Sequence, residues 1–270
     1  MNANRGIQAR LIELAAGGPA ENMAIDQALL ESAHHDVVPT LRLYSWSEPT
    51  LSLGYFQNAR DRSTHPPSST AALVRRATGG GAIVHHHELT YSFIWPLPNA
   101  SPGAKAELYR QTHRAIVQAL RSFGVEASRF GDHGNPTLTP TVARRADPSA
   151  ATLATKPREP FLCFQRRSAE DLILSGYKIL GSAQRTSRQA VLQHGSLLLE
   201  VTPSAPELPG VVDLTSRRVP IEQLAVALTA AMAQAFQLEF EKYVLGAASR
   251  RRVQEIVSER FGQPAWNEKR

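Results

Sequence analysis

The one cysteine of the chain, Cys163, precedes a lysine in a glycine-rich segment, and these two residue types together can carry out nucleophilic acyl transfer. The thiol of a free cysteine ionises at about pH 8.5, and a nearby ammonium group favours the nucleophilic thiolate. Lys178 follows Cys163 by fifteen residues, so the two side chains meet only if the fold brings them together, for example on adjacent strands. A cysteine between aromatic residues is otherwise typical of a protein core.

The composition favours a functional role for this lysine over that of an ordinary exposed strand residue. Only five of the thirty basic residues are lysines: Lys105, Lys156, Lys178, Lys242 and Lys269. Glycines at positions 176 and 181 flank Lys178, a pattern that indicates close approach of the backbone to a ligand. We therefore predict that Cys163 and Lys178 are catalytic residues.

A second candidate site is the glycine run Gly79, Gly80 and Gly81, which follows two arginines, Arg75 and Arg76. Glycines allow backbone N–H groups to approach a ligand closely and permit positive φ angles, and the arginines could hold an anion. The run matches neither the phosphate-binding Walker A loop nor the dinucleotide-binding G-x-G-x-x-G pattern. Taken alone, a glycine-rich hairpin turn without a ligand is the more common explanation.

Three histidines, His85, His86 and His87, follow the glycine run. In a strand, alternation would place His85 and His87 on one face and His86 on the other. No carboxylate completes a familiar zinc-binding pattern, so we expect no metal here. We predict instead that His85 forms hydrogen bonds beside the glycine turn.

Strands and helices must position these residues. Hydrophobic patterning predicts strands at residues 9–14, 40–46, 51–55, 71–75, 82–85, 90–95, 171–174, 178–180 and 197–199. Helical periodicity and end signals predict helices at residues 21–32, 102–124, 221–238 and 248–261. Strands before and after a long central helix indicate a single α+β domain with a mixed, mostly antiparallel sheet and flanking helices.

Residues 131–160 differ in composition from the rest of the chain, because they are rich in Thr, Pro, Ala and Arg and nearly lack large apolar residues. We expect a mobile surface loop within one catalytic domain, residues 1–270, rather than a linker between domains. The chain is expected to end in a helical C-terminal segment at residues 219–261.

The overall composition excludes several classes of protein. With 270 residues, 42 % apolar and 20 % charged, the chain can bury a sizeable core and is not disordered. No apolar run is long enough for a transmembrane helix, and we expect no signal peptide. One cysteine permits neither an internal disulfide nor a cysteine-based zinc site, so we expect a cytoplasmic protein. The net charge of +6 suits a solvated arginine-rich surface or an acidic protein partner, and no motif indicates nucleic acid.

Four ordered segments within residues 8–200 resemble the lipoate–protein ligase and octanoyltransferase family. They are Asn22-Met23-Ala24-x-Asp26; Leu43-Tyr44-x-Trp46-x-x-Pro49-x-x-Ser52-Leu53-Gly54; the glycine loop Arg75-Arg76-x-Thr78-Gly79-Gly80-Gly81-Ala82-x-x-His85 with Glu88-Leu89-Thr90-Tyr91-Ser92; and the lysine loop Gly176-x-Lys178-Ile179-x-Gly181-Ser182-Ala183-Gln184-Arg185 with Leu192-Gln193-His194-Gly195-Ser196. The resemblance implies a biotin/lipoyl-ligase-like catalytic domain, in agreement with the α+β pattern.

The resemblance also implies an activity. Octanoyltransferases of the LipM type carry the acyl group on a cysteine in a Cys-Phe dipeptide upstream of the lysine loop, and Cys163-Phe164 occupies that place. The implied reaction moves an octanoyl group from acyl carrier protein to a lysine of a lipoyl-domain protein, such as the glycine cleavage H protein, without a cofactor. Partners in this family are acidic, which agrees with the positive net charge, and neither nucleic acid nor membrane is implied. The implied substrate-binding residues are Arg76, Gly79, Gly80, Gly81, His85, Gly181, Ser182, Ala183 and His194.

Two positions depart from the LipM-type pattern. Gly81 completes the Gly-Gly-Gly sequence of the ligases where LipM-type loops usually read Gly-Gly-Arg, and His86 stands where the family commonly has aspartate. Three alternatives therefore remain open: an ATP-dependent lipoate–protein ligase, an amidotransferase that moves octanoyl groups between lipoyl proteins through a cysteine, and a non-catalytic acyl-binding protein with the same fold.

Overall fold

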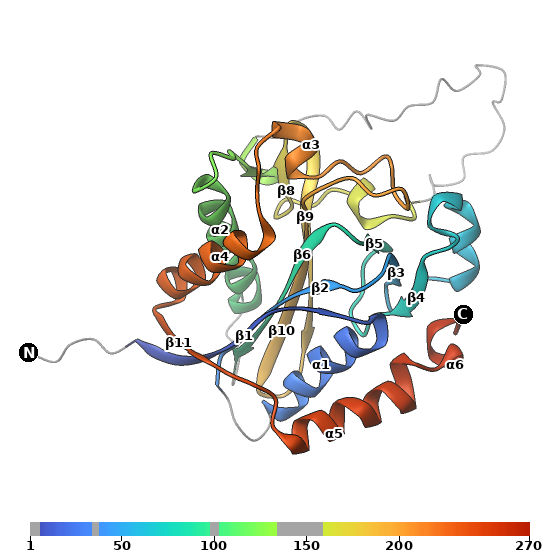
Figure 1. The fold of residues 1–270 in the computed structure, drawn as a ribbon, viewed down its shortest axis with the longest axis horizontal. Helices are drawn as coiled ribbons and strands as arrows, with labels where there is room; N and C mark the ends of the chain where they lie inside the picture. Colours follow the sequence, from blue (N-terminus) through green and yellow to red (C-terminus); the bar gives the residue numbers. More distant parts are fainter. Residues whose placement is uncertain (1–5, 34–37, 98–102, 134–158) are drawn as a thin grey trace, which may run out of the picture.

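An eight-stranded mixed sheet forms the centre of the molecule in the computed structural model, which describes residues 6–33, 38–97, 103–133 and 159–270 (Figure 1). The strand order is β11-β1-β2-β6-β10-β9-β8-β7. β1 pairs in parallel with β2 and β11, and the other neighbours pair antiparallel. The predicted α+β class is therefore confirmed. The strands are β1 (Ile7–Gly17), β2 (Thr40–Trp46), β6 (Glu88–Pro96), β7 (Ser128–Arg129), β8 (Leu172–Leu174), β9 (Tyr177–Thr186), β10 (Ala190–Leu198) and β11 (Leu238–Lys242).

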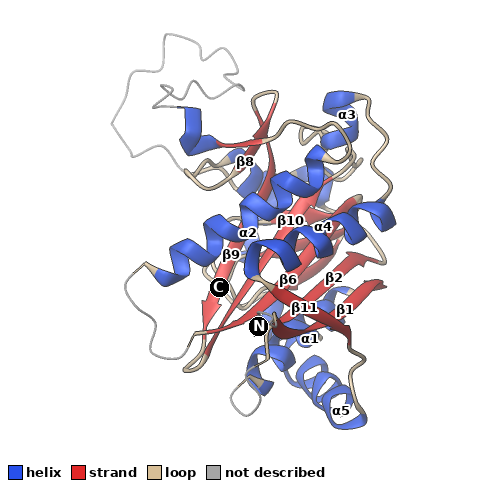
Figure 2. Ribbon diagram, turned by 90° about the vertical axis from the view of Figure 1, so that its left-hand side faces the viewer, coloured by secondary structure: helices blue, strands red, loops and turns tan. Residues whose placement is uncertain are grey.

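Helices cover both faces of this sheet, and β2 shows how the sequence allows it. Leu41 and Leu43 pack in the core beneath α2 and α4, whereas Tyr44 and Trp46 pack with residues of α1 and α5. Successive strand side chains point to opposite faces, so one apolar strand supplies two cores. Figure 2 shows α2 and α4 together across one face and α1 with α5 on the other. The helices are α1 (Pro19–Ser32), α2 (Ala104–Arg121), α4 (Ile221–Phe236) and α5 (Ala247–Ile256).

A smaller three-stranded sheet, in the order β4-β3-β5, holds the glycine run. It consists of β3 (Thr50–Leu53), β4 (Ala72–Arg75) and β5 (Ile83–His85), and the glycines lie in the loop from β4 to β5. This sheet has its own apolar cluster, which includes Leu162 and Phe164 on either side of the cysteine. The remaining short elements are η1 (Ala59–Thr64), η2 (Pro66–Ser68), η3 (Phe130–His133), η4 (Cys163–Gln165), α3 (Val211–Thr215), the π-turn η5 (Val257–Phe261) and α6 (Pro264–Asn267).

The C-terminal segment departs from the helical prediction for residues 219–261. α4 ends because Gln237 adopts a left-handed conformation, and the chain then forms β11 beside β1 before α5 begins. The alternating run Leu238-Glu239-Phe240-Glu241 suits an edge strand. Because the strand has only five residues and follows a long helix directly, its alternation was too short to be distinguished from the helical pattern. The predicted helix start at Pro102 and most of the predicted loop at 131–160 lie outside the described residues. Across the described ranges, no helix combines the length and apolarity needed to cross a membrane.

Candidate active site

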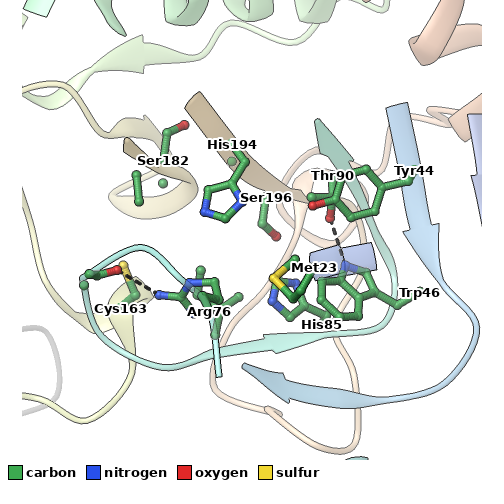
Figure 3. A pocket seen from close by; sticks show the side chains of 16 residues that line it. Met23, Tyr44, Trp46, Arg76, His85, Thr90, Cys163, Ser182, His194 and Ser196 are labelled. Atoms are coloured by element: carbon green, nitrogen blue, oxygen red, sulfur yellow. Dashed lines mark hydrogen bonds between the residues drawn. The ribbon is translucent and has the colours of Figure 1, made fainter. Parts of the chain in front are cut away.

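A largely apolar pocket with an empty volume of about 430 Å³ is lined by residues of both sheets and of α1. Figure 3 shows Cys163 at one end of this pocket and Tyr44 with Trp46 at the other. Nine residues predicted from the sequence line it: Arg76, Gly79, Gly80, His85, Cys163, Gly181, Ser182, Ala183 and His194. Seven further lining residues had no predicted role: Met23, Tyr44, Trp46, Ile83, Thr90, Gly195 and Ser196. The two other predicted residues, Gly81 and Lys178, contact Cys163 from outside this lining.

Cys163 occupies the first position of the short turn η4, not a strand. Its backbone N–H donates to the carbonyl of Ala82 at 2.7 Å, and the N–H of Ala82 donates to the carbonyl of Phe161 at 3.0 Å. These two bonds attach the turn to the end of the glycine loop. The expectation that Cys163 and Lys178 lie on adjacent strands is therefore wrong for the cysteine, although the two side chains do meet.

Lys178, the second residue of β9, directs its ammonium group at Cys163. Its Nζ lies 3.7 Å from Cys163 Sγ and 3.3 Å from the Cys163 carbonyl oxygen. The lysine side chain is only 4 % exposed, so water screens this contact weakly. An ammonium group at this distance favours the thiolate form of a cysteine.

Asp171 is a member of this cluster that the sequence analysis did not identify. Its Oδ2 lies 2.9 Å from Lys178 Nζ, and the same oxygen accepts a hydrogen bond from the backbone N–H of Ser168 at 2.7 Å. A tight turn at Ser175 and Gly176, both with positive φ, folds β8 onto β9 and brings residues 171 and 178 together. A Ser-Gly pair between two apolar runs is the sequence signal that could have indicated this hairpin.

The two glycines that flank Lys178 have different roles. Gly176 has a φ of +82°, and a Cβ atom there would meet no atom within 4 Å, so this glycine serves the hairpin turn and not ligand approach. A Cβ on Gly181 would lie 2.7 Å from Lys178 Cε and 3.9 Å from Cys163 Sγ. Gly181 therefore leaves the space that the buried lysine side chain occupies.

The two arginines before the glycine run, which the sequence suggested could hold an anion, form hydrogen bonds with backbone carbonyl groups. Arg75 is fully buried and donates to the carbonyls of Gly54, Tyr55, Gln57, Trp266, Asn267 and Lys269. Arg76 donates to the carbonyls of Gly79 and Gly81 and, at 2.7 Å, to Ser52 Oγ. Burial lowers the pKa of Arg76 to about 10, which still leaves a cation at neutral pH. Arg76 thus fixes the conformation of the glycine loop beside Cys163.

His85 forms hydrogen bonds next to the glycine loop, as the sequence predicts. Its Nδ1 lies 2.5 Å from Glu88 Oε1, and its Nε2 lies 2.6 Å from Ser52 Oγ. Burial lowers the pKa of His85 although Glu88 opposes the shift, so the ring is neutral at neutral pH. The Nδ1–H then donates to Glu88, and Nε2 accepts from Ser52. The ring also stacks on Trp46 with centroids 4.0 Å apart.

His86 and His87 do not alternate along a strand, because β5 ends at His85. Their rings stack on each other at 3.8 Å, and their Nδ1 atoms contact Thr202 Oγ1 and the carbonyl of Val201. Within the described ranges, no three His, Cys, Asp or Glu side chains are grouped so as to hold a metal ion.

His194 on β10 connects the glycine loop to α1. Its Nε2 lies 2.8 Å from Thr78 Oγ1, and its Nδ1 lies 3.2 Å from Asp26 Oδ2. Arg42 forms a buried ion pair with the same carboxylate at 2.8 Å. Burial raises the pKa of Asp26, but the hydrogen bond with His194 and the charge of Arg42 outweigh it and bring the pKa below its usual value. The position of His194 is therefore set by a charged carboxylate.

Ser182 belongs to a hydrogen-bonded chain that ends on α2. His113 Nδ1 donates to the carbonyl of Glu170 at 2.6 Å, so its Nε2 accepts from Ser182 Oγ at 2.7 Å. Tyr91 in turn donates to Ser182 Oγ at 2.7 Å. Burial lowers the pKa of His113 to about 3, which keeps the ring neutral. His113 thereby holds both Ser182 and Glu170, the residue before Asp171, in place. No local pattern in the sequence predicts this role.

Comparison with known proteins identifies the family of the chain. The family model described as the lipoyl protein ligase A/B catalytic domain matches residues 18–212. The octanoyltransferase LipM of Geobacillus kaustophilus is 31 % identical, with 97 % of this chain and 98 % of that protein covered. The octanoyltransferase LipM of Kyrpidia tusciae is 33 % identical, with coverage of 73 % and 68 %.

Solved structures show the same fold at lower sequence identity. A bipartite lipoate protein ligase from Thermoplasma acidophilum, studied with its E2 lipoyl domain, superimposes with a TM-score of 0.72 at 19 % identity, covering 97 % of this chain and 96 % of that one. A lipoate-protein ligase A bound with ATP gives 0.72 at 20 % identity, with coverage of 97 % and 98 %. Because the family model spans most of the chain and the Geobacillus kaustophilus relative covers nearly all of it, this protein belongs to the lipoyl protein ligase A/B catalytic domain family.

Proposed function

We propose that this protein is an octanoyltransferase that moves an octanoyl group from acyl carrier protein to a lysine of a lipoyl-domain protein through a thioester on Cys163. The observation that carries the proposal is the position of Cys163 Sγ, 3.7 Å from the buried Nζ of Lys178 and at one end of a largely apolar pocket. Relatives named octanoyltransferase LipM, which align over nearly the whole chain, support the same activity.

The first step loads the enzyme. The Cys163 thiolate attacks the thioester carbonyl of the octanoyl carrier protein, a new carbon–sulfur bond forms, and the carrier thiolate leaves with the electron pair of the bond that breaks. Lys178 stabilises the attacking thiolate before this step. Gly79 and Gly80 line the pocket, and the backbone N–H groups of the glycine run are the candidate donors to the developing oxyanion.

The second step delivers the acyl group. The neutral amine of a lysine on the lipoyl-domain protein attacks the acyl-enzyme, an amide bond forms, and Cys163 leaves as a thiolate while the amine proton passes to solvent. The octanoyl chain would lie along the apolar walls contributed by Met23, Tyr44, Trp46 and Ile83. The thioester already carries the activation, so neither step needs a nucleotide, a metal or another cofactor.

Charge supports the proposed partners. The net charge of +6 would attract acidic carrier and lipoyl-domain proteins such as the glycine cleavage H protein. A structural neighbour was studied with its E2 lipoyl domain, which is a partner of the same kind. We place the reaction in the cytoplasm and assign no role to nucleic acid or membrane.

Intact-mass spectrometry tests the proposal directly. The protein is mixed with octanoyl acyl carrier protein without ATP, and we expect one octanoyl group on Cys163 that hydroxylamine removes. Addition of an unmodified lipoyl domain should then transfer the group to that domain. Failure of Cys163 to acquire the octanoyl group would refute the mechanism.

The same assay separates the alternatives. A ligase would use free octanoate or lipoate only with ATP and would keep its activity in Cys163→Ala. An amidotransferase would load Cys163 from an octanoylated lipoyl protein but not from the carrier. Acyl binding without any covalent product would indicate a non-catalytic relative.

A further inference from the structure

Lys178 contacts two acidic groups at once, the thiol of Cys163 and the carboxyl group of Asp171. Only the thiol is acylated in the proposed reaction. The lysine Nζ lies 3.7 Å from Cys163 Sγ and 2.9 Å from Asp171 Oδ2. The side chains of Lys178 and Asp171 are 4 % and 3 % exposed. A buried ammonium group without a negatively charged partner is strongly disfavoured. The charge on Cys163 and the charge on Asp171 therefore both affect whether Lys178 keeps its proton.

Acylation removes one of these partners. A free Cys163 thiolate carries a negative charge beside Lys178, but a Cys163 thioester is neutral. Without Asp171, the lysine of the acyl-enzyme would be a buried cation with no counter-ion, a state that burial strongly disfavours. With Asp171 in contact at 2.9 Å, a negative charge remains beside the lysine in both states.

Two further cations act on this cluster. Arg76 interacts electrostatically with Cys163 from the glycine loop, and its burial lowers its pKa only to about 10. Arg167, next to η4, interacts with Asp171, and burial lowers its pKa. Both add positive charge that opposes protonation of Lys178, so the carboxylate of Asp171 is needed to balance them.

Two titratable groups face the cluster from α2, and both are neutral. His113 lies near Lys178, and burial lowers its pKa to about 3. Tyr109 lies near Asp171 and Cys163, and burial raises its pKa above the usual value. Neither group supplies a charge to Lys178 at neutral pH, which leaves Asp171 as the described carboxylate in contact with it.

We propose that Asp171 is a positioning residue that keeps Lys178 protonated when Cys163 carries the acyl group. This inference rests on the proposed function. It makes Lys178 a fixed cation in both half-reactions: it stabilises the attacking thiolate in the first and the departing thiolate in the second. Lys178 is then not the base that takes the proton of the acceptor amine.

The substitution Asp171→Asn gives opposite effects on the two half-reactions. Loss of a negative charge near Cys163 favours the thiolate, so the midpoint pH of thiol alkylation by iodoacetamide should fall by about one unit, which is about tenfold in rate below the midpoint. Aminolysis of the isolated octanoyl-enzyme should instead slow by about tenfold at neutral pH. The deficit should grow as pH rises, because the fraction of the variant in which Lys178 is protonated falls with pH.

Asp213→Asn is the matched control. Asp213 is also a carboxylate that accepts backbone hydrogen bonds, from Val201 and Gly210 at 2.7 and 2.8 Å, but it does not line the pocket. We expect it to change neither the alkylation profile nor the ratio of the two half-reactions. Faster aminolysis in Asp171→Asn would overturn the proposal, because it would show that a neutral Lys178 is the better catalyst.

A measurement on the unmodified protein covers the case in which Asp171→Asn fails to fold. The chain has five lysines, so carbon-13 labelling at Cε gives few signals, and the signal of Lys178 can be followed in the octanoyl-enzyme. It should report an ammonium group throughout the range from about pH 6 to about pH 9. Deprotonation within this range in the octanoyl-enzyme would refute the role of Asp171. Absence of any octanoyl-enzyme would instead refute the proposed function.

Discussion

Gly81 lies so close to Cys163 that a Cβ atom at position 81 would stand 2.9 Å from the cysteine backbone nitrogen and 3.0 Å from its Cα. Real Cβ atoms do not approach backbone this closely, so the third glycine of the run is required by the packing of the η4 turn on the glycine loop. The triple glycine, which in the sequence follows the ligase pattern, therefore has a local structural reason. It does not argue against a cysteine mechanism.

Substitution of this glycine should displace the cysteine. In Gly81→Ala, the added methyl group forces the η4 turn away from Lys178, and we expect octanoyl loading to fall at least tenfold with a loss of about 1–3 kcal/mol in the free energy of unfolding. Loading is followed by intact mass and unfolding by denaturant titration. Gly246→Ala serves as the control, because a Cβ there would meet nothing within 4 Å. Equal loading in both variants would show that the contact is unimportant.

Cys163 should be indispensable for transfer. In Cys163→Ala we expect octanoyl transfer to disappear while the thermal unfolding midpoint stays within a few degrees of the unmodified value, since the side chain is only partly buried. Cys163→Ser keeps the size of the side chain but not the thiolate, and it should also be inactive in the two-step assay. Transfer that survives in Cys163→Ala would assign this protein to the ligases.

Lys178 should control the reactivity of the thiol. Lys178→Ala removes the ammonium group 3.7 Å from Cys163 Sγ, so the midpoint pH of iodoacetamide alkylation should rise. Lys242→Ala removes a lysine whose side chain is 67 % exposed, and it should leave the midpoint unchanged. If the two variants have the same alkylation profile, Lys178 does not act on the thiolate.

His113 should make stability depend on pH. Burial lowers its pKa from 6.5 to about 3, so the unfolded chain binds a proton that the folded protein does not. The corresponding stability is present above pH 6.5 and is lost as pH falls toward 3, by at most about 1.4 kcal/mol per unit. His113→Gln removes this dependence. Between pH 7 and pH 5, we expect the unmodified protein to lose about 1–2 kcal/mol more than the variant in denaturant titrations.

A substitution of an exposed histidine serves as the control. It shows whether the pH dependence comes from the burial of His113 or simply from the loss of one histidine. His87→Gln also removes a histidine, but one that is exposed, and its stability should follow that of the unmodified protein between pH 7 and pH 5. If the free energy of unfolding of His113→Gln changes with pH as steeply as that of the unmodified protein, the buried ring does not resist protonation.

Local patterns predicted most of the framework. The alternation of residues 40–46 coincides with β2, and the strands around the glycine run and the lysine appear where the sequence places them. Period-two alternation indicates a strand from neighbouring residues alone, although it did not show that β2 is buried on both faces, and glycine indicates tight backbone approach at single positions. Local patterns also singled out the glycine run and Lys178, whereas Ser182, Ala183 and His194 were predicted only from the resemblance to a known family.

Partners from distant parts of the chain could not be predicted in this way. The contact of His194 with Asp26 joins residues 168 positions apart, and that of His113 with Ser182 joins residues 69 positions apart. Such pairs depend on how strands are ordered in the sheet, which periodicity does not encode. Asp171 was missed for a different reason, since a bulge between Leu172 and Ile173 changes the register of a short hairpin.

The contacts that assemble around the thiol join parts of the chain that lie at very different separations in the sequence. Lys178 and Asp171 are seven positions apart, so their pairing requires only a short loop to close, whereas Cys163 is held by a backbone bond to Ala82, on the far side of the chain's long central helix. Long loops close at a greater entropic cost than short ones. The lysine can therefore find its carboxylate early, while the cysteine reaches the lysine only after the small sheet has docked. A chain whose small sheet has not docked therefore lacks the backbone bond that holds Cys163 beside Lys178.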